Sequence, residues 1–175
     1  MADSERDKKY IWHEVLVSGL SNVIFNGILA WFLLRDGPNL GWGGESSFVV
    51  DIIATGLLLP LIFGYIFITL QRRKFDNGEL APISFGSSST VQSFSDRFPG
   101  SAIKSAIVFG LIGLVGIAPL TLLGFYLIGV IEASPLHYAV FKGIWAGLMA
   151  SILVVPMILI AMRKPKNINM PSGKD

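Results

Sequence analysis

The sequence alternates between four long apolar stretches and shorter polar segments. The apolar stretches cover about residues 11–34, 48–70, 103–131 and 137–162. Because a helix needs about 20 consecutive apolar residues to cross the hydrocarbon core of a bilayer, each stretch is long enough to span a membrane. The pattern therefore predicts an all-α integral membrane four-helix bundle, in which residues 1–175 form a single four-span domain.

A line of polar residues runs along the first apolar stretch. Glu14, Ser18, Asn22 and Asn26 follow one another at intervals of four, so on a helix they form one nearly continuous face. Lipid cannot satisfy the hydrogen bonds of an amide, so this face is expected to point at other helices or at a wet cavity. Asn22 and Asn26 therefore either hold helices together or line a path for water or a substrate.

Asp51 and Lys142 are charged residues inside the second and fourth apolar stretches, and their depth bears on their role. Asp51 precedes Arg72 by 21 residues, and Lys142 precedes Arg163 by 21. A helix of that length measures about 31 Å, close to the hydrocarbon thickness, so both groups lie near the outer boundary. Three interpretations remain open: each reaches water at the interface, the two form an ion pair, or they bind a ligand or ion. Thr55 lies one turn after Asp51 and continues its face.

Small residues in the fourth stretch predict close helix packing. Gly143, Gly147 and Ser151 are spaced by four, and small residues at that spacing let two helices approach closely. The partner helix belongs either to this chain or to a second copy of it. Three prolines inside the stretches, Pro60, Pro119 and Pro156, each remove a backbone hydrogen bond and are expected to favour kinks.

The second and fourth stretches contain a short echo of each other. Residues 54–60 (ATGLLLP) resemble residues 150–156 (ASILVVP), and a basic cluster follows each. The echo predicts a parallel repeat of two helical hairpins, as in some transporters, with a chance match between apolar segments as the alternative. Aligning the two prolines places Lys142 five residues farther out than Asp51, which argues against their pairing.

The distribution of basic residues predicts the orientation. With four spans, both termini and the Ser-rich polar loop, residues 71–102, lie on one side, together with a basic tail, residues 163–175. Of the 14 Lys and Arg residues, Arg35 and Lys142 alone fall on the other side. Cytoplasmic loops carry the Lys/Arg excess, so both termini are predicted to be cytoplasmic. Aromatic residues near the predicted ends suit belts at the membrane surface: Trp12, Trp31, Trp42, Tyr126, Tyr138 and Trp145.

Composition narrows the classes of function. Apolar residues make up 52% of the chain and charged residues 15%, against about 25% charged in ordinary soluble domains. The chain has no cysteine, which excludes disulfides, thiol catalysis and Cys-ligated metals. Its two histidines, His13 and His137, fall on opposite sides and cannot share a metal site. No catalytic motif occurs, and the basic residues lie at membrane boundaries, so no catalytic residue, metal, cofactor or nucleic-acid partner is expected.

Several short motifs in the first two stretches resemble a known class of protein. The class consists of small four-span bacterial inner-membrane proteins, some loosely called permeases. The matching motifs are Asn22-x-x-x-Asn26-Gly27, Trp31 and Asp51-x-x-Ala54-Thr55-x-x-x-x-Pro60. The resemblance implies a multi-pass protein of the bacterial inner membrane and implies no particular reaction.

Two functions remain as hypotheses beside an enzyme, which the sequence favours least. The first is a small permease or transporter, with the bilayer and a second copy as partners, whose polar path runs along Asn22, Asn26, Asp51 and Thr55. The second is a non-catalytic accessory or assembly subunit that binds another membrane protein. A transporter predicts a hydrated cavity that reaches Asn22 and Asn26, whereas an accessory protein predicts a dry polar stripe or one that a partner covers.

Overall fold

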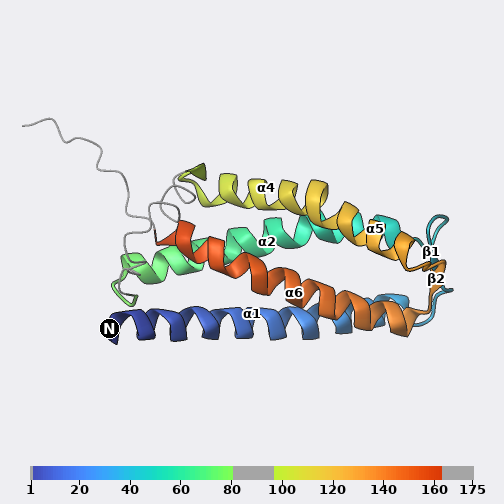
Figure 1. The fold of residues 1–175 in the computed structure, drawn as a ribbon, viewed down its shortest axis with the longest axis horizontal. Helices are drawn as coiled ribbons and strands as arrows, with labels where there is room; N and C mark the ends of the chain where they lie inside the picture. The colour runs from blue at the N-terminus through green and yellow to red at the C-terminus, as the bar shows by residue number, and fades with distance from the viewer. Residues whose placement is uncertain (1, 81–96, 163–175) are drawn as a thin grey trace, which may run out of the picture.

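The computed structural model describes residues 2–80 and 97–162 (Figure 1). Within these ranges the fold is all-helical apart from one two-stranded sheet. Four helical segments are long and apolar enough to cross a membrane, which confirms that part of the sequence prediction. The Ser-rich part of the predicted loop, within residues 81–96, and the basic tail lie outside the described residues.

Two of the helices extend beyond the apolar stretches that predicted them, whereas the third helical segment ends at Leu127, before the predicted residue 131. The long helices are α1 (Ala2–Leu34), α2 (Phe48–Asp76) and α6 (Pro135–Ala161), and the third span consists of α4 (Ala102–Ile112), the π-helical segment η1 (Gly113–Ile117) and α5 (Ala118–Leu127). Ser47 and Ser134 cap α2 and α6, because each side-chain oxygen accepts a backbone N–H of the first turn. α2 ends before Gly78, whose φ of 74° suits a residue without Cβ.

The third span changes helix type at its middle, and Pro119 explains why. Proline has no N–H and cannot bond the carbonyl four residues earlier. Just before it, the N–H of Ala118 bonds the carbonyl of Gly113, five residues back, which makes the π turn. Pro60 and Pro156, by contrast, lie inside continuous α-helices.

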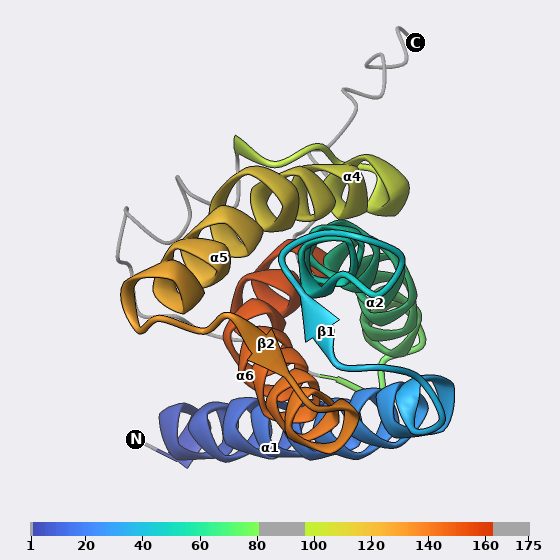
Figure 2. The same cartoon turned by 90° about the vertical axis from the view of Figure 1, so that its right-hand side faces the viewer.

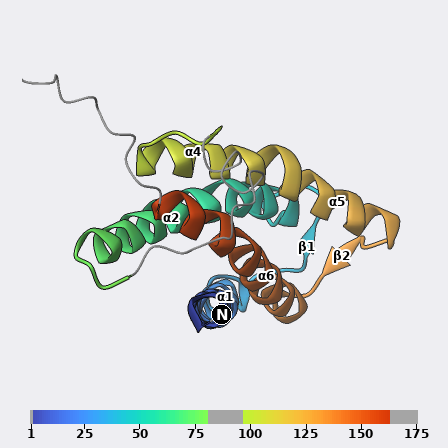
Figure 3. The same cartoon turned by 60° about the vertical axis from the view of Figure 1, so that its left-hand side comes forward.

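The helix α6 lies at the centre of the arrangement (Figure 2). It packs against α1 on one side and against α2 on another, while α4 packs against α2. In the most apolar window of each helix, 56% of the residues of α6 are buried but only 22% of those of α1. Figure 3 shows α1 end-on beside α6, at the edge of the molecule.

The helices of each predicted hairpin pack against helices of the other hairpin. α1 of the first hairpin packs on α6 of the second, α4 of the second packs on α2 of the first, and α2 and α6 run in the same direction (Figure 1). A parallel repeat of two hairpins would produce this exchange of partners. The two interfaces are not equivalent in detail, because Gly147 faces Gly19 in one and Gly113 faces Gly56 in the other. The repeat therefore stays a prediction.

The two connections at one end of the bundle pair with each other. β1 (Leu40–Gly41) and β2 (Glu132–Ala133) form an antiparallel ladder, and the indole N–H of Trp42 donates to the carbonyl of Val130 at 2.7 Å. Neither strand was predicted from the sequence, because two residues are too few to show strand alternation. We call this end of the molecule the outer end and the end at which α1 begins the inner end.

Candidate functional site

The polar stripe of α1 faces the interior of the molecule. Ser18 and Asn26 are buried, and Asn22 is half-buried. The Asn22 amide donates to the carbonyl of Ser18 at 2.9 Å, and the Asn26 amide donates to the carbonyl of Asn22 at 3.1 Å. Both amides therefore bond within their own helix, rather than to a second helix as the structural interpretation of the stripe assumed.

Small residues bring α1 and α6 into backbone contact. A Cβ added at Gly143 would lie 2.8 Å from the carbonyl oxygen of Val23, and one at Gly147 would lie 2.8 Å from that of Gly19. One turn further along α6, Ser151 donates a hydrogen bond to the carbonyl of Val15 at 3.3 Å. The helix that these small residues contact belongs to the same chain.

Asp51 and Lys142 form an ion pair at the outer end. Lys142 Nζ lies 2.5 Å from Asp51 Oδ1, and the hydroxyl of Tyr138 donates to Asp51 Oδ2 at 2.6 Å. The side chains of Lys142 and Asp51 are 13% and 33% exposed. Of the three interpretations left open, the structure has the ion pair, which ties α2 to α6.

Tyr138 belongs to this cluster, which was not predicted from the sequence. Tyr138 was assigned to a surface belt, but the residue is buried. The signal was present, because Tyr138 precedes Lys142 by four residues and so shares its face of α6. The alignment of prolines misjudged the relative depth of Asp51 and Lys142. Asp51 lies in the first turn of α2, where the helix dipole favours a negative charge.

Thr55 and Trp145 also lie differently from what the sequence suggested. Thr55 is half-buried and takes no part in the Asp51 cluster. Trp145, assigned to a surface belt, packs against both apolar core clusters. Its indole N–H donates to the hydroxyl of Thr121 at 3.0 Å, and that hydroxyl donates to the carbonyl of Ile117 at 2.8 Å, at the end of the π segment.

A second polar contact fixes α2 at the inner end. The hydroxyl of Tyr10 donates to Gln71 Oε1 at 2.5 Å, and Gln71 is only 2% exposed. The sequence analysis placed Gln71 at the start of the polar loop, whereas it belongs to α2. Because Asp51 bonds Tyr138 and Gln71 bonds Tyr10, a tyrosine hydroxyl anchors α2 near each of its ends.

Replacing Tyr10 with phenylalanine is expected to destabilise the protein by about 1–3 kcal/mol, because the buried Gln71 amide loses its partner. Thermal unfolding of the purified protein in detergent measures the loss. Tyr65→Phe is the matched control, since Tyr65 is exposed and lies on the same helix as Gln71. Equal shifts in melting temperature for the two variants would contradict a role for the Tyr10–Gln71 bond.

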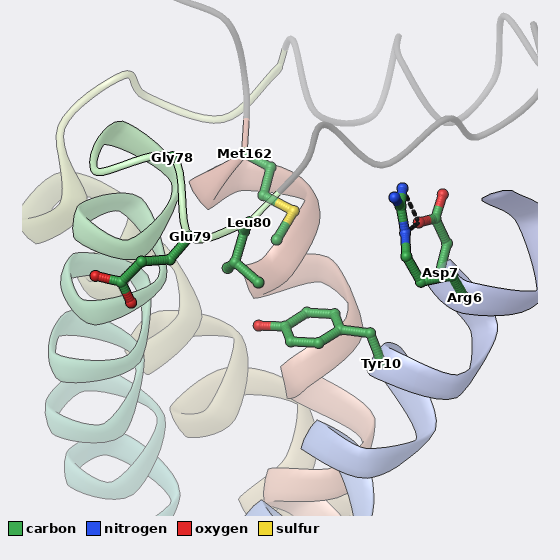
Figure 4. A pocket seen from close by; sticks show the side chains of 7 residues that line it. All are labelled: Arg6, Asp7, Tyr10, Gly78, Glu79, Leu80 and Met162. Carbon is green, nitrogen blue, oxygen red and sulfur yellow. Dashed lines mark hydrogen bonds and ion pairs between the residues drawn. The ribbon is translucent and has the colours of Figure 1, made fainter.

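A cavity of about 320 Å³ opens beside Tyr10 at the inner end (Figure 4). Arg6 and Asp7, which form an ion pair at 3.1 Å, line one side. The turn after α2 and the end of α6 line the other, through Gly78, Glu79, Leu80 and Met162. None of the candidate path residues Asn22, Asn26, Asp51 and Thr55 lines this cavity.

Neither the described residues nor comparison with known proteins points to a particular chemistry. Within residues 2–80 and 97–162, no group of three His, Asp or Glu residues is placed to hold a metal ion. Comparison of the chain with known protein families, characterised proteins and solved structures gives no match. The contacts of the polar side chains are therefore what guides the functional proposal.

Proposed function

We propose that the chain is a multi-pass protein of the bacterial inner membrane with both termini in the cytoplasm. Four membrane-length apolar helices support the membrane location. Basic residues concentrate at the inner end, where α1 begins, α2 ends and α4 begins. An excess of Lys and Arg is typical of the cytoplasmic side. The resemblance of the first two spans to small bacterial inner-membrane proteins supports the choice of membrane.

Within that membrane, we infer that the protein acts as a non-catalytic accessory or assembly subunit that binds another membrane protein. The observation that carries the inference is the internal use of the polar groups in the spans. Asn22 and Asn26 bond their own helix, and Asp51 bonds Lys142 and Tyr138. A polar stripe whose amides bond within their own helix fits a structural subunit better than a substrate path. The edge position of α1 leaves a broad apolar face for a partner.

A small transporter is the second candidate, and the third span favours it. The π segment Gly113–Ile117 interrupts the helix near the middle of the span, and such segments are frequent at functional sites. Asp51 is also one-third exposed, so its carboxylate remains accessible despite the ion pair. If this candidate holds, replacing Asn22 and Asn26 with leucine abolishes transport.

Cysteine accessibility distinguishes the two candidates, and the cysteine-free sequence gives a clean background. Single cysteines replace Ser18, Asn22, Asn26 and, as a positive control, the exposed Glu45 of the outer connection. We expect a membrane-impermeant thiol reagent to label position 45 and to leave the three positions in α1 unmodified. Labelling at 22 and 26 would instead indicate a water-filled path and favour the transporter.

A photocrosslinking residue at Phe25 is the second arm of this test, because Phe25 is exposed on the free side of α1. An accessory subunit should give one discrete heterologous adduct in intact cells. The same probe at Ala30, which is buried in the same helix, is the matched control and should give none. Lipid adducts alone at position 25 would contradict the accessory role for this face.

A further inference from the structure

Five basic residues gather at the inner end where α2 and α4 meet. We call them the inner basic cluster: Arg72, Arg73, Lys74, Arg97 and Lys104. Four of them are exposed, and Arg72 is half-buried. Among the residues that the structure describes, no carboxylate lies within 4.0 Å of any of the five. Within the part of the chain that the structure describes, the cluster is therefore a concentrated positive charge with no carboxylate paired to it.

The packing of α2 on α4 fixes the position of this cluster. A Cβ at Gly64 would lie 3.8 Å from Ala106 Cα, so the two helices are in close contact. Two turns later, Arg72 donates to the carbonyl of Gly100 at 3.0 Å and joins the end of α2 to the segment before α4. Lys104 lies about one turn deeper than this bond. A lysine at that depth reaches the surface by extending its stem along apolar neighbours.

An exposed apolar stripe continues from the cluster along α4. Ile103, Ile107 and Leu111 are all exposed and are spaced by four residues, so they lie on one face of the helix. Positive charge at a helix end above an apolar stripe complements an amphiphile with a negative head and a hydrocarbon tail.

We propose that the inner basic cluster binds the phosphate of an anionic phospholipid, with an acyl chain along Ile103, Ile107 and Leu111. Guanidinium and ammonium groups both bind phosphate through charge-assisted hydrogen bonds, and basic pockets between spans on the cytoplasmic side are suited to lipid headgroups. The inference rests on the proposed membrane location but on neither the accessory nor the transport role.

Native mass spectrometry of the protein in detergent tests the proposal with added phosphatidylglycerol or phosphatidylcholine. We expect phosphatidylglycerol to bind at least about 25-fold more tightly. Each basic residue near a headgroup contributes about fivefold in affinity, so Arg72→Gln with Lys104→Gln should weaken phosphatidylglycerol binding about 25-fold and leave phosphatidylcholine unchanged. Inorganic phosphate at the same concentration should not compete, because it has no acyl chain.

The control variant carries Lys8→Gln and Lys9→Gln. It removes the same charge from α1, also at the inner end but outside the cluster, and should retain phosphatidylglycerol binding within about twofold. Equal losses in the two double variants, or no preference for phosphatidylglycerol in the unmodified protein, would overturn the proposal. If Arg72→Gln prevents folding, Arg73→Gln with Lys104→Gln tests the same cluster and spares the Arg72–Gly100 bond. The assay needs no protein partner or substrate, so its outcome is independent of the accessory role.

Discussion

Replacing Lys142 with leucine is expected to destabilise the protein by about 3 kcal/mol. Among the described residues, the variant would leave the Asp51 carboxylate at the outer end with the Tyr138 hydroxyl as its one side-chain partner. Removing one member of a buried ion pair costs about 3–5 kcal/mol, because the remaining charge is uncompensated. We take the lower end because the Asp51 side chain is 33% exposed and water partly replaces the lost partner.

Chemical or thermal unfolding in detergent measures this effect, and a second ion pair supplies the control. Arg35 and Asp36 form a pair at 3.2 Å in which both side chains are exposed, and such pairs contribute little. Asp36→Asn should therefore change the free energy of unfolding by less than about 1 kcal/mol. The double variant Asp51→Asn, Lys142→Leu should be more stable than Lys142→Leu alone, because no buried charge is left. A double variant that is no more stable than the single one would show that the pair is not the cause.

Replacing Gly113 with alanine is expected to destabilise the protein by about 2 kcal/mol or more, through overpacking between α2 and the third span. The added Cβ would overlap the carbonyl oxygen of Gly56 and lie 2.9 Å from Cγ of Pro60. A backbone carbonyl and a proline ring cannot rotate away, so the helices themselves must separate. The melting temperature in detergent should fall accordingly.

Gly116 provides a matched control three residues later in the same π segment. A Cβ at Gly116 meets no atom within 4 Å. Gly116→Ala should therefore be neutral or stabilise by up to about 1 kcal/mol, since alanine favours helices more than glycine does. If the two alanine variants lose stability equally, glycine is required for the π conformation and not for the contact with Gly56.

Hydrophobic pattern and residue spacing predicted the helices and some of the contacts. The four apolar stretches correspond to four membrane-length helices, because span length follows directly from bilayer thickness. Counting residues from Asp51 to Arg72 and from Lys142 to Arg163 placed both charges near one boundary. Their pairing was one of three interpretations, and only the packing of α2 beside α6 decides among them.

The choice of neighbouring helices could not be read from the sequence. Most apolar side chains of α1 remain exposed, Phe25 and Phe32 among them, so hydrophobicity does not mark which face meets another helix. The amide groups of Asn22 and Asn26 could have bonded either a neighbouring helix or a ligand. In the structure, both donate to backbone carbonyls of α1 instead. The Tyr10–Gln71 bond joins residues 61 positions apart, and no local pattern indicates such a contact.

The packing of α1 on α6 sets an order of events during synthesis. The helix α1 is synthesised before its partner, because α1 ends at Leu34 and α6 begins at Pro135. At about 5–20 residues per second, synthesis of the intervening chain takes about 5–20 s. During that time α1, an apolar helix of membrane-spanning length, must remain without its partner. Because Asn22 and Asn26 bond the backbone of their own helix, their amides have hydrogen-bond partners during this interval, before α6 has been made.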